Sequence, residues 1–301
     1  MRLLLLSVLG MGVSSFALAK DKVPTVAKAP VDVSIPVDLT SGRPAVMARI
    51  AGGEPIAVEF DTGSQGAVIP RALANKLGLK ETGEIQLGSP FGGKPITAKT
   101  VSLGTLEIGG VAATNVTAVV QEDASFMGPD ARLVIGPAQF GNKVVALDYP
   151  TRTLRIANQI NADNRRWQPL KNGLLKTDLL LAGKSIPLHI DSGNPGTLML
   201  PKSVVGTLSP KPDLREVGRA RTVDKEFVIY VGSVNRDATL AGVPIRLGDI
   251  AFGDVPSANL GSQGLAQFTV IVDFSRKRWQ LVVPEGVTPL MTARQRAPQP
   301  Q

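Results

Sequence analysis

The sequence predicts an all-β protein made of two similar lobes, and two repeated features carry this prediction. An apolar strand over residues 56–60 runs into Asp-Thr-Gly-Ser at residues 61–64, and a second apolar strand over residues 186–190 runs into Asp-Ser-Gly-Asn at residues 191–194. Each half also contains an apolar residue followed by glycine, with a later aspartate twelve positions on. A repeat this long indicates two lobes and not a solenoid, whose period would be far shorter.

The first nineteen residues have the pattern of a secretory signal peptide, with a charge at Arg2, an apolar core over residues 3–10 and a small-x-small cleavage site at residues 17–19. A membrane anchor is the alternative, but glycine and serine interrupt the apolar run, which is short for a bilayer span. No later stretch is apolar enough to form a transmembrane helix. We therefore expect secretion or export to a bacterial periplasm, with no stable membrane span after cleavage.

The composition excludes several classes of site. The chain has no cysteine, one histidine and a formal net charge of +8. Without cysteine there are no disulfides and no thiol chemistry, and the single His189 argues against a zinc site. We therefore expect no metal and no cofactor. Lysine and arginine are scattered with few aromatic residues beside them, which is typical of a solvated surface and not of a nucleic-acid partner.

The first lobe is predicted over residues 31–157, after a leader or linker over residues 20–30. Alternating apolar and polar residues predict its strands. A short helix over residues 71–79 follows Pro70 and is ended by Gly78. The strands are expected over residues 31–39, 46–50, 56–60, 101–108, 116–120, 144–149 and 154–156, with a hairpin over 84–98 and a helical turn over 137–140.

The second lobe is predicted over residues 169–284, after a polar and basic connection over residues 158–168. Residues 285–301 are rich in proline, glutamine, threonine and arginine and are expected to be a disordered tail. The strands of the second lobe follow the order of the first and are expected over residues 174–181, 186–190, 227–231, 243–248 and 270–274.

The repeated aspartate indicates acid–base chemistry by a pair of carboxyl groups. Two buried carboxyl groups that face each other cannot both ionise cheaply, so they share one proton. One then removes a proton from an attacking water, and the other donates a proton to the carbonyl oxygen and then to the leaving nitrogen. A single Asp-Thr-Gly also occurs in ordinary turns, and the second copy is what favours the catalytic interpretation.

These motifs resemble those of the aspartic proteases, both the bilobal pepsin-like enzymes and the single-lobe retropepsin-like ones. Residues 133–136 and 259–261 are similar to the apolar-glycine element of the family. The resemblance covers about residues 31 to 284. It implies two pepsin-like β-barrel lobes with an active-site cleft between them, and it makes Asp61 and Asp191 the catalytic pair for a peptide or protein substrate.

The same resemblance implies contacts for the residues that support the two loops. The hydroxyls of Thr62 and Ser192 would brace the loops across the interface. The amides of Gly63 and Gly193 would donate to the carboxylates, and Ser64 would donate to the first aspartate.

Two features depart from the pattern of the family. Asn194 stands where serine, threonine or alanine is usual, although its amide can still donate a hydrogen bond. The hairpin expected to cover the substrate, with Ser89, Phe91, Gly92 and Gly93 at its tip, lacks the tyrosine of pepsin-like flaps. Phe91 could pack on a substrate instead, and the alternative is a simple glycine-rich turn.

Two hypotheses of function follow. The first is an exported, metal-independent aspartic endopeptidase that acts as a monomer and uses Asp61 and Asp191. The second is a catalytically inactive peptide- or protein-binding module on the same fold, which Asn194 and the missing flap tyrosine would allow. The intact pair of aspartates favours the first, because a binding module does not need both.

Overall fold

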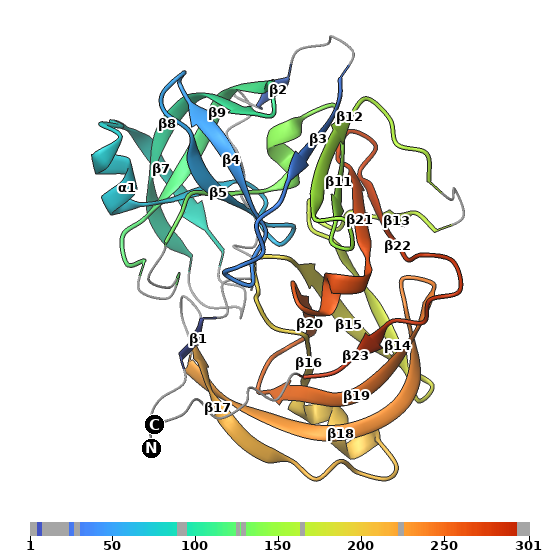
Figure 1. The fold of residues 1–301 in the computed structure, drawn as a ribbon. Helices are drawn as coiled ribbons and strands as arrows, with labels where there is room; N and C mark the ends of the chain where they lie inside the picture. Colours follow the sequence, from blue (N-terminus) through green and yellow to red (C-terminus); the bar gives the residue numbers. More distant parts are fainter. Residues whose placement is uncertain are drawn as a thin grey trace.

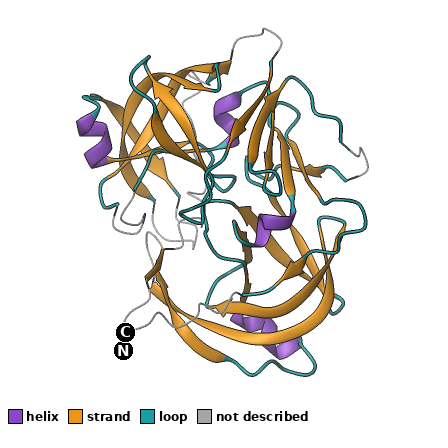
Figure 2. Ribbon diagram, viewed as in Figure 1, coloured by secondary structure: helices purple, strands orange, loops and turns teal. Residues whose placement is uncertain are grey.

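The computed structural model describes residues 5–7, 24–26, 31–88, 95–124, 127, 131–162, 166–221 and 226–293. The described residues form three β-sheets with a few short helices at their margins, so the all-β class predicted from the sequence is confirmed (Figures 1 and 2). Two sheets close into barrels, one in each half of the sequence, and the third joins the halves.

The first barrel is a closed ring, because β8 pairs with β9 in addition to the chain of pairings β9-β6-β10-β5-β4-β8. Its strands bury alternate side chains, as β4 shows, and Phe60 and Ile69 lie in its core. The helix α1 follows Pro70, whose fixed φ and missing N–H suit a helix start. The elements are β2 (Thr25–Val26), β4 (Ala45–Ile50), β5 (Ile56–Phe60), β6 (Ala67–Pro70), α1 (Arg71–Lys76), β7 (Glu81–Leu87), β8 (Ile96–Ile108), β9 (Val111–Gln121) and β10 (Val134–Ile135).

The second barrel repeats this arrangement, with β18 pairing β19 to close the ring β18-β14-β15-β20-β16-β19. Leu188, Leu200 and Phe252 are among the side chains that fill its core. Its elements are β14 (Lys176–Leu181), β15 (Lys184–Asp191), β16 (Leu198–Pro201), a 3₁₀ helix (Lys202–Thr207), β17 (Arg215–Arg221), β18 (Glu226–Leu240), β19 (Val243–Gly253), β20 (Ala258–Gly261) and β23 (Leu290–Met291).

The third sheet joins the two halves (Figure 1). A late strand of each half pairs with its counterpart from the other half, with Ala146 of β11 opposite Ile271 of β21. Two 3₁₀ helices, Pro137–Phe140 and Gly264–Gln267, lead into these strands. The sheet has the order β13 (Gln168–Pro169), β22 (Arg278–Val282), β21 (Thr269–Asp273), β11 (Val144–Asp148), β12 (Thr153–Ala157) and β3 (Asp32–Pro36).

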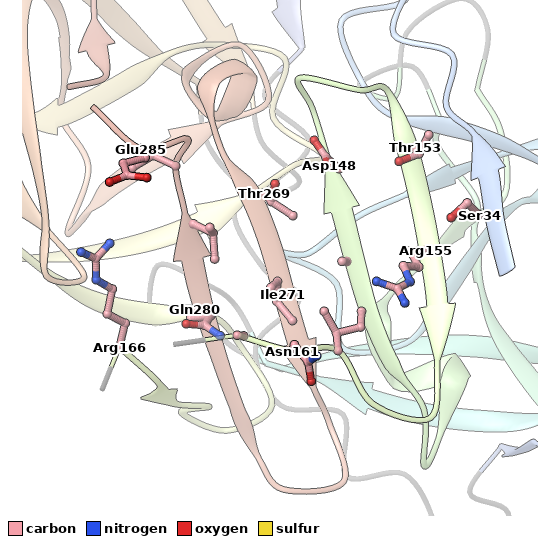
Figure 3. A pocket seen from close by; sticks show the side chains of 15 residues that line it. Ser34, Asp148, Thr153, Arg155, Asn161, Arg166, Thr269, Ile271, Gln280 and Glu285 are labelled. Atoms are coloured by element: carbon pink, nitrogen blue, oxygen red, sulfur yellow. The ribbon is translucent and has the colours of Figure 1, made fainter. Parts of the chain in front are cut away.

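The two faces of this joining sheet differ. Val145 and Val272 point into the main core, whereas Ala146 and Ile271 belong to a separate small cluster. On that second face a groove of about 860 Å³ runs across the strands, and Gln280 and Arg155 are among its polar lining residues (Figure 3). Neither predicted catalytic aspartate lines it.

The structure corrects two predicted boundaries. The leader over residues 20–30 contains β2, which pairs with β9 and buries Val26, so the first lobe begins earlier than predicted. The tail predicted as disordered over residues 285–301 contains β23, which pairs in parallel with β19 and buries Met291. In both segments a short apolar stretch too brief to show periodicity is held by an existing strand edge. Residues 294–301 lie outside the described part.

Part of the predicted signal peptide also has a place in the structure. Leu5–Ser7 forms β1, which pairs in parallel with Arg219–Arg221 of β17. The remaining residues of the segment 1–19 lie outside the description, so cleavage stays a prediction. Within the described ranges, no helix has the length and apolar character needed to cross a membrane.

Candidate active site

Each predicted catalytic aspartate stands where a central barrel strand ends. Asp61 follows β5 directly, and Asp191 is the last residue of β15. Both strands run parallel to the apolar-glycine strand of their own lobe, with Phe60 beside Ile135 and Ile190 beside Leu260. The ends of these strands next to the aspartates are buried and paired on both sides, so the two turns start from well-held positions.

The glycines that end the apolar-glycine strands allow the two loops to pack closely. A Cβ added to Gly136 would lie 2.1 Å from the carbonyl oxygen of Ser64, and one added to Gly261 would lie 2.5 Å from the carbonyl oxygen of Gly196. Both distances are far below van der Waals contact, and the atoms approached are backbone. Only glycine fits at these two positions.

Gly136→Ala is therefore expected to destabilise the protein by about 3 kcal/mol or more, because the Asp61 loop must move to make room. Denaturant unfolding with the free energy extrapolated to water measures this loss. Gly206→Ala is the matched control, because a Cβ there meets nothing within 4 Å, and it should stay within about 0.5 kcal/mol of the wild type. Equal stability of the two variants would contradict the close packing.

The two loops are braced by four reciprocal hydrogen bonds. The Thr62 amide donates to Ser192 Oγ at 2.8 Å, and the Ser192 amide donates to Thr62 Oγ1 at 3.0 Å. Each hydroxyl then donates to a carbonyl oxygen of the opposite lobe, Thr62 to Ile190 at 3.2 Å and Ser192 to Phe60 at 2.8 Å. All of these groups are buried, so the two lobes hold each other's active-site loop in a fixed position.

The brace brings the two carboxyl groups together. Asp61 is 4% exposed and Asp191 is fully buried. A Cβ added to Gly63 would lie 2.7 Å from Asp191 Oδ1 and 3.1 Å from Asp61 Oδ1. Both carboxyl groups thus border the same point in space.

The donors around the pair are unequal. Asp61 Oδ1 accepts the amides of Gly63 at 2.7 Å and Gly193 at 3.0 Å. Asp191 accepts the Asn194 amide on Oδ1 at a longer 3.2 Å and the side-chain amide of Asn259 on Oδ2 at 2.8 Å. The first carboxyl is therefore the better stabilised as an anion, because two short backbone hydrogen bonds reach one of its oxygens.

The pKa values follow this asymmetry. Burial raises the pKa of Asp61, and the amides of Gly63 and Gly193 oppose that rise. Burial also raises the pKa of Asp191, and the nearby Asp61 charge raises it further, well above its ordinary value. The rise in pKa is thus the larger for Asp191, which makes it the carboxyl group of the two that holds a proton more readily.

Asn259 is a site residue that the sequence analysis missed. It occupies the position of Val134 in the first lobe, and its Oδ1 accepts a hydrogen bond from Asn194 Nδ2 at 2.6 Å. Asn194, Asn259 and Asp191 thus form one buried chain of hydrogen bonds. The available signal was a polar residue in an element that is apolar in the other lobe.

Other predicted residues have different surroundings. Ser64 Oγ donates to the carbonyl oxygen of Gly66 at 2.9 Å, so it supports its own loop and does not reach the Asp61 carboxyl as expected. The flap residues Ser89, Phe91, Gly92 and Gly93 lie outside the described residues. Burial lowers the pKa of His189 to about 3, which keeps its ring neutral in the core of the second lobe.

Comparison with known proteins fits this geometry. Residues 46–137 match the family model described as aspartyl protease, a segment that contains Asp61 and its apolar-glycine strand. The chain has the fold of a bilobal aspartic protease. The second barrel carries the corresponding aspartate loop and apolar-glycine strand. No curated protein matched the sequence.

Among the described residues, no group of three or more His, Cys, Asp or Glu side chains is placed to hold a metal ion. The chemistry that the site offers from its own residues is proton transfer by two coupled carboxyl groups.

Proposed function

We propose that this protein is an exported aspartic endopeptidase that hydrolyses peptide bonds with a water activated by Asp61 and Asp191. The observation that carries the proposal is the pair of buried carboxyl groups that border the same point in space between two braced loops. A module that only binds peptides has no use for such a pair, because burying two carboxyl groups together is costly. Both aspartates come from one chain, so the protein is proposed to act as a monomer.

The unequal donors assign a role to each carboxyl group. Asp61, held as an anion by the amides of Gly63 and Gly193, accepts a proton from the water that attacks the peptide carbonyl. Asp191, which carries the shared proton, donates it to the carbonyl oxygen. In the second step the proton gained by Asp61 passes to the leaving nitrogen, the C–N bond breaks, and a hydroxyl of the tetrahedral intermediate returns a proton to Asp191 as the carboxyl product forms.

Cleavage of a denatured protein or a peptide library between acidic and neutral pH tests the proposal. We expect new amino termini to appear, inhibition by a statine-type mimic of the tetrahedral intermediate, and no effect of chelators. Binding of peptides without any cleavage over this pH range would support the inactive binding module instead.

Export is a separate part of the proposal. It is supported by the charged, apolar and small-residue pattern of residues 1–19. Expression of the full chain in a bacterial host, followed by fractionation and amino-terminal sequencing, should yield a mature protein beginning at Lys20. A cytoplasmic protein that retains Leu5–Ser7 on β17 would contradict it.

The Asn259 amide gives a further prediction for the proposed enzyme. Asn259→Leu keeps the volume of the side chain but removes the donor to Asp191 Oδ2 and leaves the Asn194 amide buried without its acceptor. We expect about a tenfold loss of kcat/KM and a loss of about 2 kcal/mol in unfolding free energy. The hydrogen bond from Asn259 lowers the pKa of Asp191, so the alkaline limb of the pH–rate profile should move to higher pH.

Asn161→Leu provides the control for this variant, because Asn161 is exposed and lies beside the groove of the joining sheet (Figure 3). It should leave both the rate and the pH profile unchanged. An unchanged alkaline limb in Asn259→Leu would show that Asn259 does not act on the Asp191 carboxyl.

A further inference from the structure

A buried arginine of the first lobe reaches the active-site loop of the second. Arg43 lies just before β4, and only 8% of it is exposed. Its Nε donates to the carbonyl oxygen of Gly193 at 2.8 Å, and its Nη1 donates to the carbonyl oxygen of Met127 at 3.0 Å. The guanidinium group is thus held in place by two backbone oxygens, one of which belongs to the Asp191 loop.

The oxygen that Arg43 contacts is part of a peptide group that also contacts the aspartate pair. The carbonyl of Gly193 and the amide of Asn194 form one peptide unit. Its oxygen accepts from Arg43, and its N–H donates to Asp191 Oδ1 at 3.2 Å. The N–H of Gly193 itself donates to Asp61 Oδ1 at 3.0 Å. Arg43 therefore binds the carbonyl of Gly193, whose own amide reaches Asp61 and whose following amide reaches Asp191.

A hydrogen bond from a charged donor to the oxygen of a peptide strengthens the hydrogen bond that its N–H gives. It also fixes the plane of that peptide, which a glycine would otherwise leave free to rotate. Without Arg43, only the conformation of the loop would hold the Gly193–Asn194 peptide in the orientation from which its N–H donates to Asp191. Both effects act on the orientation of the Asp191 carboxyl.

The charge of Arg43 is close to another buried group. Glu59 Oε1 lies 3.8 Å from Arg43 Nε and makes no hydrogen bond within the described structure. Burial raises the pKa of Glu59 to about 8, while Arg43 and Arg132 lower it and Asp61 raises it. Below that pH Glu59 is neutral and does not oppose the positive charge of Arg43, which lowers the pKa of Asp61.

We propose that Arg43 is a positioning residue of the endopeptidase, which orients the Gly193–Asn194 peptide toward Asp191 and favours the singly ionised state of the aspartate pair. The inference rests on the proposed function. It differs from the inter-lobe brace of Thr62 and Ser192, because those hydroxyls carry no charge and do not bind the peptide unit whose N–H reaches Asp191.

The test compares the wild type with Arg43→Met and Arg43→Lys, and uses Arg49→Met as a matched control. Arg49 is exposed and donates to the carbonyl oxygen of Gly53 at 2.9 Å, so its replacement removes the same kind of contact away from the site. The measurements are the pH profile of kcat/KM and a titration of the aspartate carboxyl carbons by ¹³C NMR. Asp61→Asn and Asp191→Asn assign the two resonances.

In Arg43→Met we expect kcat/KM to fall by about tenfold or more. Loss of the positive charge raises the pKa of the pair, so both limbs of the pH profile and the carboxyl titration should move to higher pH. Arg43→Lys keeps the charge but cannot make both contacts, so kcat should fall while the limbs stay in place. Arg49→Met should match the wild type in every measurement.

The proposal is overturned if Arg43→Met titrates like the wild type. If Arg43→Met does not fold, the lysine variant decides, and a wild-type kcat in Arg43→Lys also overturns it. The NMR titration separates the two proposals. A wild type without any peptidase activity, whose carboxyl titration still shifts in Arg43→Met, refutes the endopeptidase and retains the effect of Arg43 on the pair. If the wild type has peptidase activity and the carboxyl titration does not shift in Arg43→Met, the endopeptidase is retained and the effect of Arg43 on the aspartate pair is refuted.

Discussion

Replacing either aspartate of the pair by asparagine is expected to lower kcat/KM for peptide cleavage by roughly a thousandfold, because each variant removes one partner of the acid–base step. In Asp61→Asn the site has no base for the attacking water. In Asp191→Asn it has no proton to give to the carbonyl oxygen. The double variant should be hardly worse than either single one, because the two carboxyl groups act as one unit.

A stability measurement shows whether the variants remain folded. The pKa of Asp191 is raised in the folded state by burial and by Asp61. Its stabilising contribution is therefore fully present below its unfolded pKa of 3.8 and is lost as pH rises through the folded value. Asp191→Asn lacks this loss, so at neutral pH it should unfold at a higher temperature than the wild type.

The control for both asparagine variants is Asp148→Asn. Asp148 lies at the end of β11, where it accepts a hydrogen bond from the Thr151 amide in a turn. Its replacement should leave kcat/KM unchanged. Cleavage that survives in Asp61→Asn or Asp191→Asn, with both variants folded, would contradict the proposed mechanism.

The sequence predicted the parts of this fold that repeat. The alternating strands, the two Asp-containing turns and the two apolar-glycine strands each follow from a local pattern of residues, and their order in each half was enough to predict two lobes. The pairing of β11 with β21 could not be predicted, because both strands read as buried strands and nothing local says that their partner lies in the other half. β2 and β23 were missed for the related reason that two residues on a sheet edge have no periodicity.

The candidate site divides in the same way. Asp61 and Asp191 were found because they recur in equivalent positions. Arg43, Glu59 and Asn259 have no counterpart of their own type in the other lobe, so the comparison of halves that identified the aspartates passes over them. Glu59 did carry a signal, since it is a charged residue in an otherwise apolar strand, two positions before Asp61. What it does depends on Arg43, which reaches it only in the folded structure.

Glu59→Gln is expected to stabilise the protein at neutral pH. Burial raises the pKa of Glu59 to about 8 from an ordinary value of 4.5. The stability that goes with the raised pKa is fully present below pH 4.5 and is lost as pH rises toward 8, because the unfolded chain releases the proton and the folded chain retains it. Glutamine has nearly the same shape and cannot ionise. The unfolding free energy of the variant minus that of the wild type should therefore be about 3 kcal/mol larger at pH 7 than at pH 4.

The measurement is the unfolding free energy of the variant and the wild type at several pH values from 4 to 8. The other titrating groups are the same in the two proteins, so their contributions cancel in the difference between the two unfolding free energies. This difference should grow steadily above pH 4.5. Glu54→Gln, at an exposed position, is the control and should show no such trend. A difference that stays constant would mean that Glu59 is ionised in the folded protein and neutralises Arg43.

The outcome therefore bears on the active site as well as on stability. A neutral Glu59, whose Oε1 lies 3.8 Å from Arg43 Nε, does not oppose the positive charge of Arg43. That charge lowers the pKa of Asp61, and it is reduced once Glu59 ionises near pH 8. At acidic pH, Glu59→Gln should thus cleave as fast as the wild type. Near pH 8 the variant should lose less activity than the wild type, because only the wild type has an ionised glutamate that opposes the charge of Arg43. The same substitution would then separate the two effects of Arg43 on the site. It changes the net charge near the aspartates and leaves the hydrogen bond from Arg43 to Gly193 in place.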